Sequence, residues 1–177
     1  MSRHYAASTR DRIGDLVTGM RIDTSVGAAT TYVTSAQKEI FNVYGRIMIL
    51  EMYLEVITAF GANASTVQFN ATFLDTDGTT SLYTVQNLSA TSTDDLTSAA
   101  AGDRLNYVGG AVTGVPTVSS TPAIGDEHCA DPTIVGMENG IGTIGVVTAG
   151  ADATDGTCQF SIHYIPMSDG AYVTAVF

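Results

Sequence analysis

Few residues in this 177-residue chain have the types and spacing that chemistry requires. Asp75, Asp77 and Gly78 begin like a calcium-binding loop, in which carboxylate oxygens at alternate positions hold the ion. A complete loop needs further oxygen ligands and a closing Glu, whereas Thr and Ser residues follow here. We therefore interpret residues 75–80 as a hairpin turn and expect the protein to bind no metal.

The thiols and imidazoles also raise the question of a metal site. His128 and Cys129 are adjacent, and Cys158 precedes His163 by five residues. On a strand this odd separation puts Cys158 and His163 on opposite faces, and the spacing matches no closed zinc pattern. We interpret both cysteines as small core residues and both histidines as surface residues. The cysteines could pair, but two of them are no disulfide framework, and we favour the reduced form.

Motifs of catalysis are missing from the sequence. It contains no nucleophile elbow, no phosphate-binding loop and no dinucleotide fingerprint. Three histidines and scattered carboxylates have no spacing that would position a triad. We therefore expect a protein that is not an enzyme and has no cofactor.

The elements that would position any site are best marked in residues 47–57. The β-branched residues there favour a strand over a helix, although the spacing of Glu51 and Glu55 would suit a helix. The odd positions are mixed, and the even ones are all apolar. The pattern predicts a long strand whose buried face carries Met48, Leu50, Met52, Leu54 and Val56.

Short β-prone segments separated by Gly, Asn, Asp and Ser predict an all-β fold, either a β-sandwich or a barrel, with a jelly-roll-like arrangement. Residues 109–140 are rich in Gly, Thr, Ser and Pro and are interpreted as a long surface excursion. The other predicted strands are 67–73, 81–86, 105–108, 141–148, 156–164 and 171–177.

Charge is distributed unevenly along the chain. The net charge of −11 argues against nucleic acid as a partner. Residues 1–22 have four basic and two acidic side chains, whereas residues 47–177 have one basic and fourteen acidic ones. No apolar segment has the length of a membrane span, and the first residues lack the apolar region of a signal peptide. We expect no membrane partner and synthesis in a cytoplasm.

This contrast predicts two parts, an N-terminal arm over residues 1–30 and a β domain over residues 31–177. The arm lacks steady periodicity, and its few apolar residues cannot form a core of their own. An extended arm that docks on a partner is the preferred interpretation; a short helix at 10–18 or a poorly ordered terminus are the alternatives. The predicted partner-binding residues are Arg10, Arg12, Ile13, Leu16, Val17, Met20, Arg21 and Ile22.

Two segments carry a resemblance to a known family. Residues 41–69, with "NVYGRI" and then "GANAST", and residues 141–177, with "FSIHYIPMSDGA", resemble small virion structural proteins of tailed bacteriophages. Residues 85–135 show no such resemblance. The resemblance implies a head decoration (cement) protein built as a β-sandwich or barrel, located in the virion and assembled in the host cytoplasm.

Three functions remain open from the sequence. The first is a capsid decoration protein that binds the major capsid protein as a homo-oligomer, with a trimer favoured, and that gains avidity from many copies. The second is an adhesive or carbohydrate-binding module of a tail tip or fibre, for which Tyr83, Tyr107 and Tyr172 are the candidate aromatic platforms. The third and least favoured is a hydrolase on a β scaffold.

Overall fold

The computed structural model describes residues 19–61, 65–74, 81–89, 96, 99–107, 117–119 and 132–177. These residues form one antiparallel sheet of ten strands and a one-turn helix, α2 (Ala29–Tyr32). The all-β prediction is therefore confirmed. The strands are β1 (Met20–Asp23), β2 (Gly27–Ala28), β3 (Lys38–Thr58), β4 (Ser65–Leu74), β5 (Ser81–Asn87), β6 (Arg104–Asn106), β7 (Thr117–Ser119), β8 (Thr133–Gly150), β9 (Thr157–Pro166) and β10 (Tyr172–Ala175).

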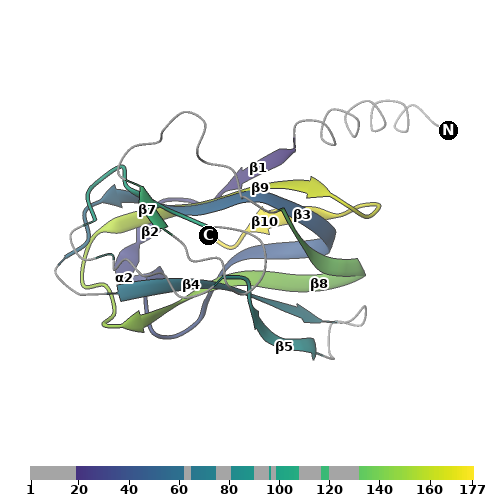
Figure 1. The fold of residues 1–177 in the computed structure, drawn as a ribbon, viewed down its shortest axis with the longest axis horizontal. Coiled ribbons are helices and arrows are strands. Elements are labelled where there is room, and N and C mark those ends of the chain that lie inside the picture. Colours follow the sequence, from purple (N-terminus) through teal and green to yellow (C-terminus); the bar gives the residue numbers. More distant parts are fainter. Residues whose placement is uncertain are drawn as a thin grey trace.

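The 21-residue strand β3 organises the sheet. Its first half pairs with β8 and β10, and its second half pairs with β9 and β6. The main order is β1-β9-β3-β8-β4-β5. Because strands twist and bend, the sheet curls until β1 and β9 lie on one side of the core and β4, β5 and β8 on the other (Figure 1).

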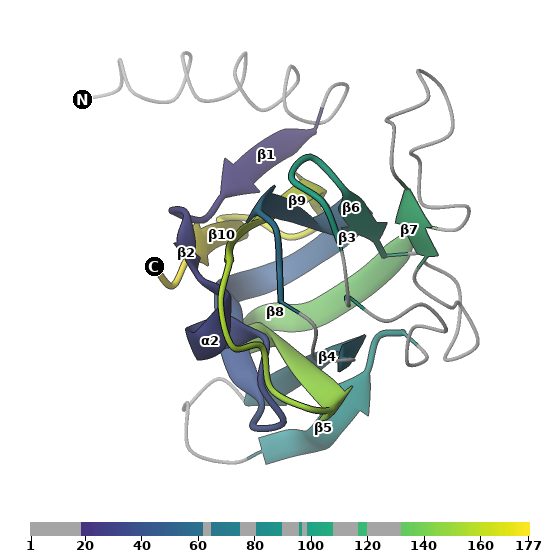
Figure 2. The same ribbon diagram turned by 90° about the vertical axis from the view of Figure 1, so that its left-hand side faces the viewer.

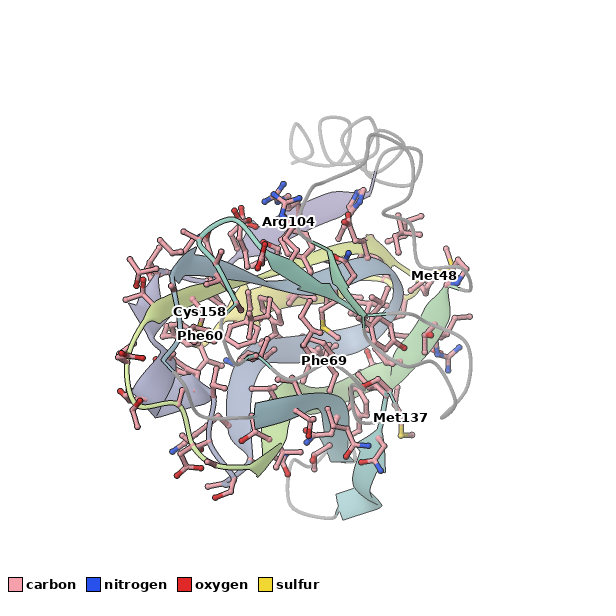
Figure 3. All side chains as sticks on the ribbon, turned by 60° about the vertical axis from the view of Figure 1, so that its left-hand side comes forward. Met48, Phe60, Phe69, Arg104, Met137 and Cys158 are labelled. Carbon is pink, nitrogen blue, oxygen red and sulfur yellow. The ribbon has the colours of Figure 1, made fainter. Side chains whose placement is uncertain are left out.

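The curled sheet does not close into a barrel, so the barrel alternative is wrong. Closure would require a ladder between β1 and β5, the two ends of the strand order, and the described residues form none. One continuous sheet thus supplies both layers around the core, as the end-on view shows (Figure 2). The core side chains include Phe69 and Cys158, which lie between the layers (Figure 3).

The buried face of β3 changes parity, which corrects one prediction. Met52, Leu54 and Val56 are buried as expected, but Met48 and Leu50 are only half-buried. Ile47 and Ile49 face the core in their place. The pairing with β9 shifts by one residue between Ile49 and Glu51, and such an extra residue moves all following side chains to the opposite face.

The predicted boundary at residue 30 is also wrong. β1 pairs with β9 from Met20 opposite Tyr164 to Asp23 opposite Ser161, and β2 pairs with the start of β9. The Phe160 N–H donates to the Thr24 hydroxyl at 3.0 Å. Residues 20–30 therefore belong to the folded body of this chain.

All the predicted strands are present, although their ends differ. The largest difference is in the predicted excursion 109–140, because residues 133–140 already belong to β8 and residues 117–119 form β7. Val135 is buried and pairs with the buried Ile47 of β3, which accounts for the early start of β8. The predicted hairpin turn at 75–80 lies outside the described residues.

Candidate partner-binding surface

The chain bulges on both sides of the middle of β3, within β8 on one side and between β9 and β10 on the other. On one side Tyr44 pairs with Ile141 and Arg46 with Gly136, so residues 137–140 stand opposite Gly45 alone. On the other side Tyr44 pairs with Tyr172 and Ile47 with Pro166, so residues 167–171 stand opposite Gly45 and Arg46. The two bulges flank a short stretch of β3 from both sides.

Glycines make this double bulge sterically feasible. Gly45 has φ +75°, and a Cβ there would approach the Ser168 Oγ to 2.7 Å. Gly136 has φ +87°, and its Cβ would run into the carbonyl oxygen of Gly45. Left-handed backbone and close approach are both roles for which glycine is suited. The loop is fixed by the Arg46 N–H, which donates to the Ser168 Oγ at 2.9 Å, and by the Met167 N–H, which donates to the Arg46 carbonyl at 2.8 Å.

Around the double bulge, the outer face of the sheet exposes large apolar side chains. Directly paired residues of neighbouring strands share a face, so two apolar rows form on either side of Arg46. The exposed fractions are 56% for Ile134, 41% for Ile141, 44% for Met167 and 45% for Tyr172. We call this surface the outer patch and define it by Tyr44, Arg46, Met48, Ile134, Ile141, Ile165, Met167 and Tyr172.

The aromatic part of the outer patch is a stacked pair. The rings of Tyr44 and Tyr172 lie 4.4 Å apart with an interplanar angle of 14°. Beneath it, the Val173 N–H donates to the hydroxyl of the buried Tyr164 at 3.1 Å, which ties β10 to β9 across the bulge. Two anchored strands therefore hold the exposed Tyr172 ring in place.

Charged side chains of both signs surround the outer patch. Arg46 is exposed at its centre, and the flanking bulges carry the exposed Glu138 and Asp169. Within the described part of the chain, neither Arg46 nor Glu138 forms a salt bridge. Met48 and Met137, one from β3 and one from the β8 bulge, lie on the same side of the molecule (Figure 3).

A second cluster occupies the other half of the outer face, over Tyr53. The guanidinium of Arg104 lies 4.6 Å from the Tyr53 ring centroid and that of Arg21 lies 5.8 Å from it. Arg104 bonds Glu55 at 3.1 Å, and Arg21 bonds Asp23 at 2.9 Å. The stacked arginines cover Tyr53, which is only 3% exposed.

The pKa of Asp23 is set by its place in this cluster. Burial alone would raise its pKa, but hydrogen bonds from Ser161 and Arg21 outweigh burial and hold the pKa below its usual range. The Ser161 hydroxyl donates to Asp23 at 2.6 Å. The bond to Asp23 in turn raises the pKa of Arg21. The cluster thus compensates its own charges and binds β1 to the body of the sheet.

The structure describes three of the eight predicted partner-binding residues. Met20 and Ile22 of β1 are half-buried against the core, and Arg21 belongs to the Tyr53 cluster. Their role toward a partner stays a prediction. The other five, Arg10, Arg12, Ile13, Leu16 and Val17, lie outside the described residues.

The structure also places several of the thiol, imidazole and tyrosine side chains that the sequence analysis considered as sites. Cys158 is buried, as expected, and burial raises the pKa of its thiol to about 12, whereas His163 lies on the outer face. Among the candidate platforms, Tyr107 is buried and Tyr172 is exposed, while the Tyr83 side chain lies outside the description. In the described ranges no three His, Cys, Asp or Glu side chains gather as a metal site would require, and no helix could cross a membrane.

Sequence reasoning did not identify the outer patch as a site. The available signal was the pair of resembling motifs: "NVYGRI" contains Gly45, and "IPMSDGA" includes the bulge packed against it.

Comparison with known proteins found no relative. A scan against protein-family models and searches of curated proteins and solved structures found no match.

Proposed function

We propose that this chain is a non-enzymatic virion structural protein, a capsid decoration protein that binds and stabilises a phage head shell. The observation that carries the proposal is the outer patch, an apolar surface exposed between charged bulges. Exposed apolar patches rimmed by polar residues are typical of surfaces that dock on another protein. Protein–protein assembly is therefore the use that this geometry supports best.

The resemblance to phage virion proteins has a local basis that supports the same proposal. The two resembling motifs lie far apart in the sequence and meet at Gly45, where they build the bulge of the outer patch. In the proposed assembly the arm, with Arg10, Arg12, Ile13, Leu16 and Val17, binds the major capsid protein, and many copies supply avidity. The particle is assembled in the host cytoplasm.

A second candidate function is a carbohydrate-binding module of a tail tip or fibre. The observation in its favour is Tyr172, whose exposed ring is held by stacking on Tyr44. Aromatic rings present a broad apolar face with a polar tip, which suits a flat ligand. The two candidates differ in copy number, since a shell protein covers a lattice and a tail-tip protein does not.

The test is the composition of purified tailed particles from a host that produces this protein. Quantitative gel analysis should find the chain at hundreds of copies per particle. A handful of copies would favour the tail-tip alternative, and particles without the chain would refute both. Removing residues 1–18 should abolish shell binding, as judged by co-sedimentation with the shell, while the circular dichroism spectrum stays unchanged.

A further inference from the structure

We propose that the outer patch is the contact between two copies of this chain, paired about a two-fold axis with Arg46 of each copy against Glu138 of the other. The inference rests on the proposed use of the outer patch as a docking surface and names its occupant. In such a contact one patch meets itself, so every interaction occurs twice.

The apolar part of the patch has the composition that a contact core needs. Tyr172, Met167, Ile134 and Ile141 are each more than two-fifths exposed, and they come from β10, the bulge between β9 and β10, and β8, on the two sides of β3. Aromatic residues and methionine are enriched at the cores of protein interfaces, where they anchor the contact. The Tyr172 ring is already held on Tyr44 at 4.4 Å, so little ordering is left for the binding step.

The charges of the patch select a second copy as the partner. Arg46 stands at the centre of the patch and Glu138 on the adjacent bulge, and neither has an ion-pair partner among the described residues. A uniformly acidic or basic partner would satisfy one of the two and repel the other. A second copy brings both signs at the same spacing, and a two-fold axis between them matches each with its opposite.

The second described cluster of the outer face, over Tyr53, does not offer the same contact. Arg21 and Arg104 already bond Asp23 and Glu55, and together they cover Tyr53. Of the four basic residues that the structure describes, only Lys38 and Arg46 form no salt bridge with another described residue. Arg46 is the one that sits among exposed apolar side chains.

The experiment uses charge reversal in the full chain. Sedimentation velocity over a range of concentrations gives the self-association constant of the unaltered protein, which should form this two-fold dimer instead of the trimer that the sequence favoured. Arg46→Glu puts two acids together and Glu138→Arg two bases, so each variant alone should dimerise about tenfold more weakly or worse. Mixed in equal amounts, the two variants should recover the unaltered affinity, because both opposite-sign contacts then form again.

Apolar variants complete the design. Tyr172→Ser and Ile134→Ser should also weaken the dimer, whereas Val26→Ser and Val176→Ser, which alter exposed valines outside the outer patch, should not. Circular dichroism and thermal unfolding of each variant separate a lost contact from a lost fold. The proposal is refuted by a chain that stays monomeric, by reversal variants that pair as the unaltered chain does, or by a mixture that recovers nothing. Because it needs only purified chain, this result is independent of the copy number in particles.

Discussion

The ring of Phe177 stacks on the ring of Tyr32, with centroids 3.6 Å apart and planes inclined by 15°. Phe160 closes the group, with its ring edge-on to both at about 6.5 Å from each. The Phe177 carbonyl also accepts a hydrogen bond from the Ser25 N–H at 2.9 Å. Phe177 therefore holds α2 and the segment after β1 against β9.

Truncation of this ring should be costly. Phe177→Ala is expected to lower the free energy of unfolding by about 2–4 kcal/mol, at or below the usual loss for a buried phenylalanine because the ring is only partly buried. Chemical denaturation followed by circular dichroism measures the change. Val176→Ala, at a neighbouring exposed position, is the control and should change stability by less than about 0.5 kcal/mol. Equal effects of the two variants would contradict the packing role of Phe177.

The parity change in β3 makes a second prediction about stability. Leu54 is fully buried, so Leu54→Ala should cost about 2–5 kcal/mol. Leu50, at the register shift, is only half-buried, and Leu50→Ala should cost clearly less. Urea unfolding of both variants measures the difference in their free energies of unfolding. A larger loss for Leu50→Ala than for Leu54→Ala would support the unbroken alternation that the sequence suggested.

Local pattern was sufficient to predict that β3 is a strand, since Ile47, Ile49 and Val56 have the β-branched side chains that a sheet prefers. It was insufficient to place the register shift at Leu50. Such a shift is set by pairing with β9, more than 100 residues further along the chain. Nothing in the local sequence around Leu50 records that pairing.

The outer patch was missed for the same reason. Gly45, Gly136 and the bulge 167–171 are separate in the sequence. Their meeting point is a property of the ladder of strands. The charge contrast between the first residues and the body was visible in the sequence, but it could not show that Met20 to Asp23 pair with β9.

The double bulge predicts an unequal response of two glycines. Gly45 and Gly170 both have left-handed backbone, with φ +75° and +73°. An alanine at either position therefore carries a strain of about 1–2 kcal/mol. At Gly45 the new methyl also meets Ser168 and Ala171, whereas nothing lies within 4 Å at Gly170. Gly45→Ala should lose about 1–3 kcal/mol more than Gly170→Ala in denaturant titrations, and equal losses would argue against the close packing of the bulge.

The attachment of β1 should depend on pH through Asp23. Its pKa is lower in the folded protein than in the unfolded chain, so its stabilising contribution is complete above the ordinary carboxyl pKa of about 4. That contribution is lost as the pH falls through the lowered folded-state pKa. The hydrogen-exchange protection of the β1 amides, relative to the intrinsic exchange rate at each pH, should therefore fall in this acid range, and Asp23→Asn should remove the pH-dependent step. Asp155→Asn, outside the cluster, is the control; an identical acid response in Asp23→Asn would refute the assignment.

Burial of Cys158 makes its reactivity a probe of the fold. The side chain has no exposed surface, and burial raises the pKa of the thiol to about 12. Since the thiolate is the reactive form, alkylation near neutral pH should require opening of the sheet between β2, β9 and β3. The Cys129→Ser variant leaves Cys158 as the only thiol of the chain. Iodoacetamide should modify this variant slowly under native conditions and rapidly in denaturant. Rapid native labelling at neutral pH would show that Cys158 is not enclosed by the two layers.

The raised pKa of Cys158 also affects stability. The neutral thiol favours the folded state below the ordinary thiol pKa, and this contribution to the free energy of unfolding declines as the pH rises from the ordinary value toward about 12.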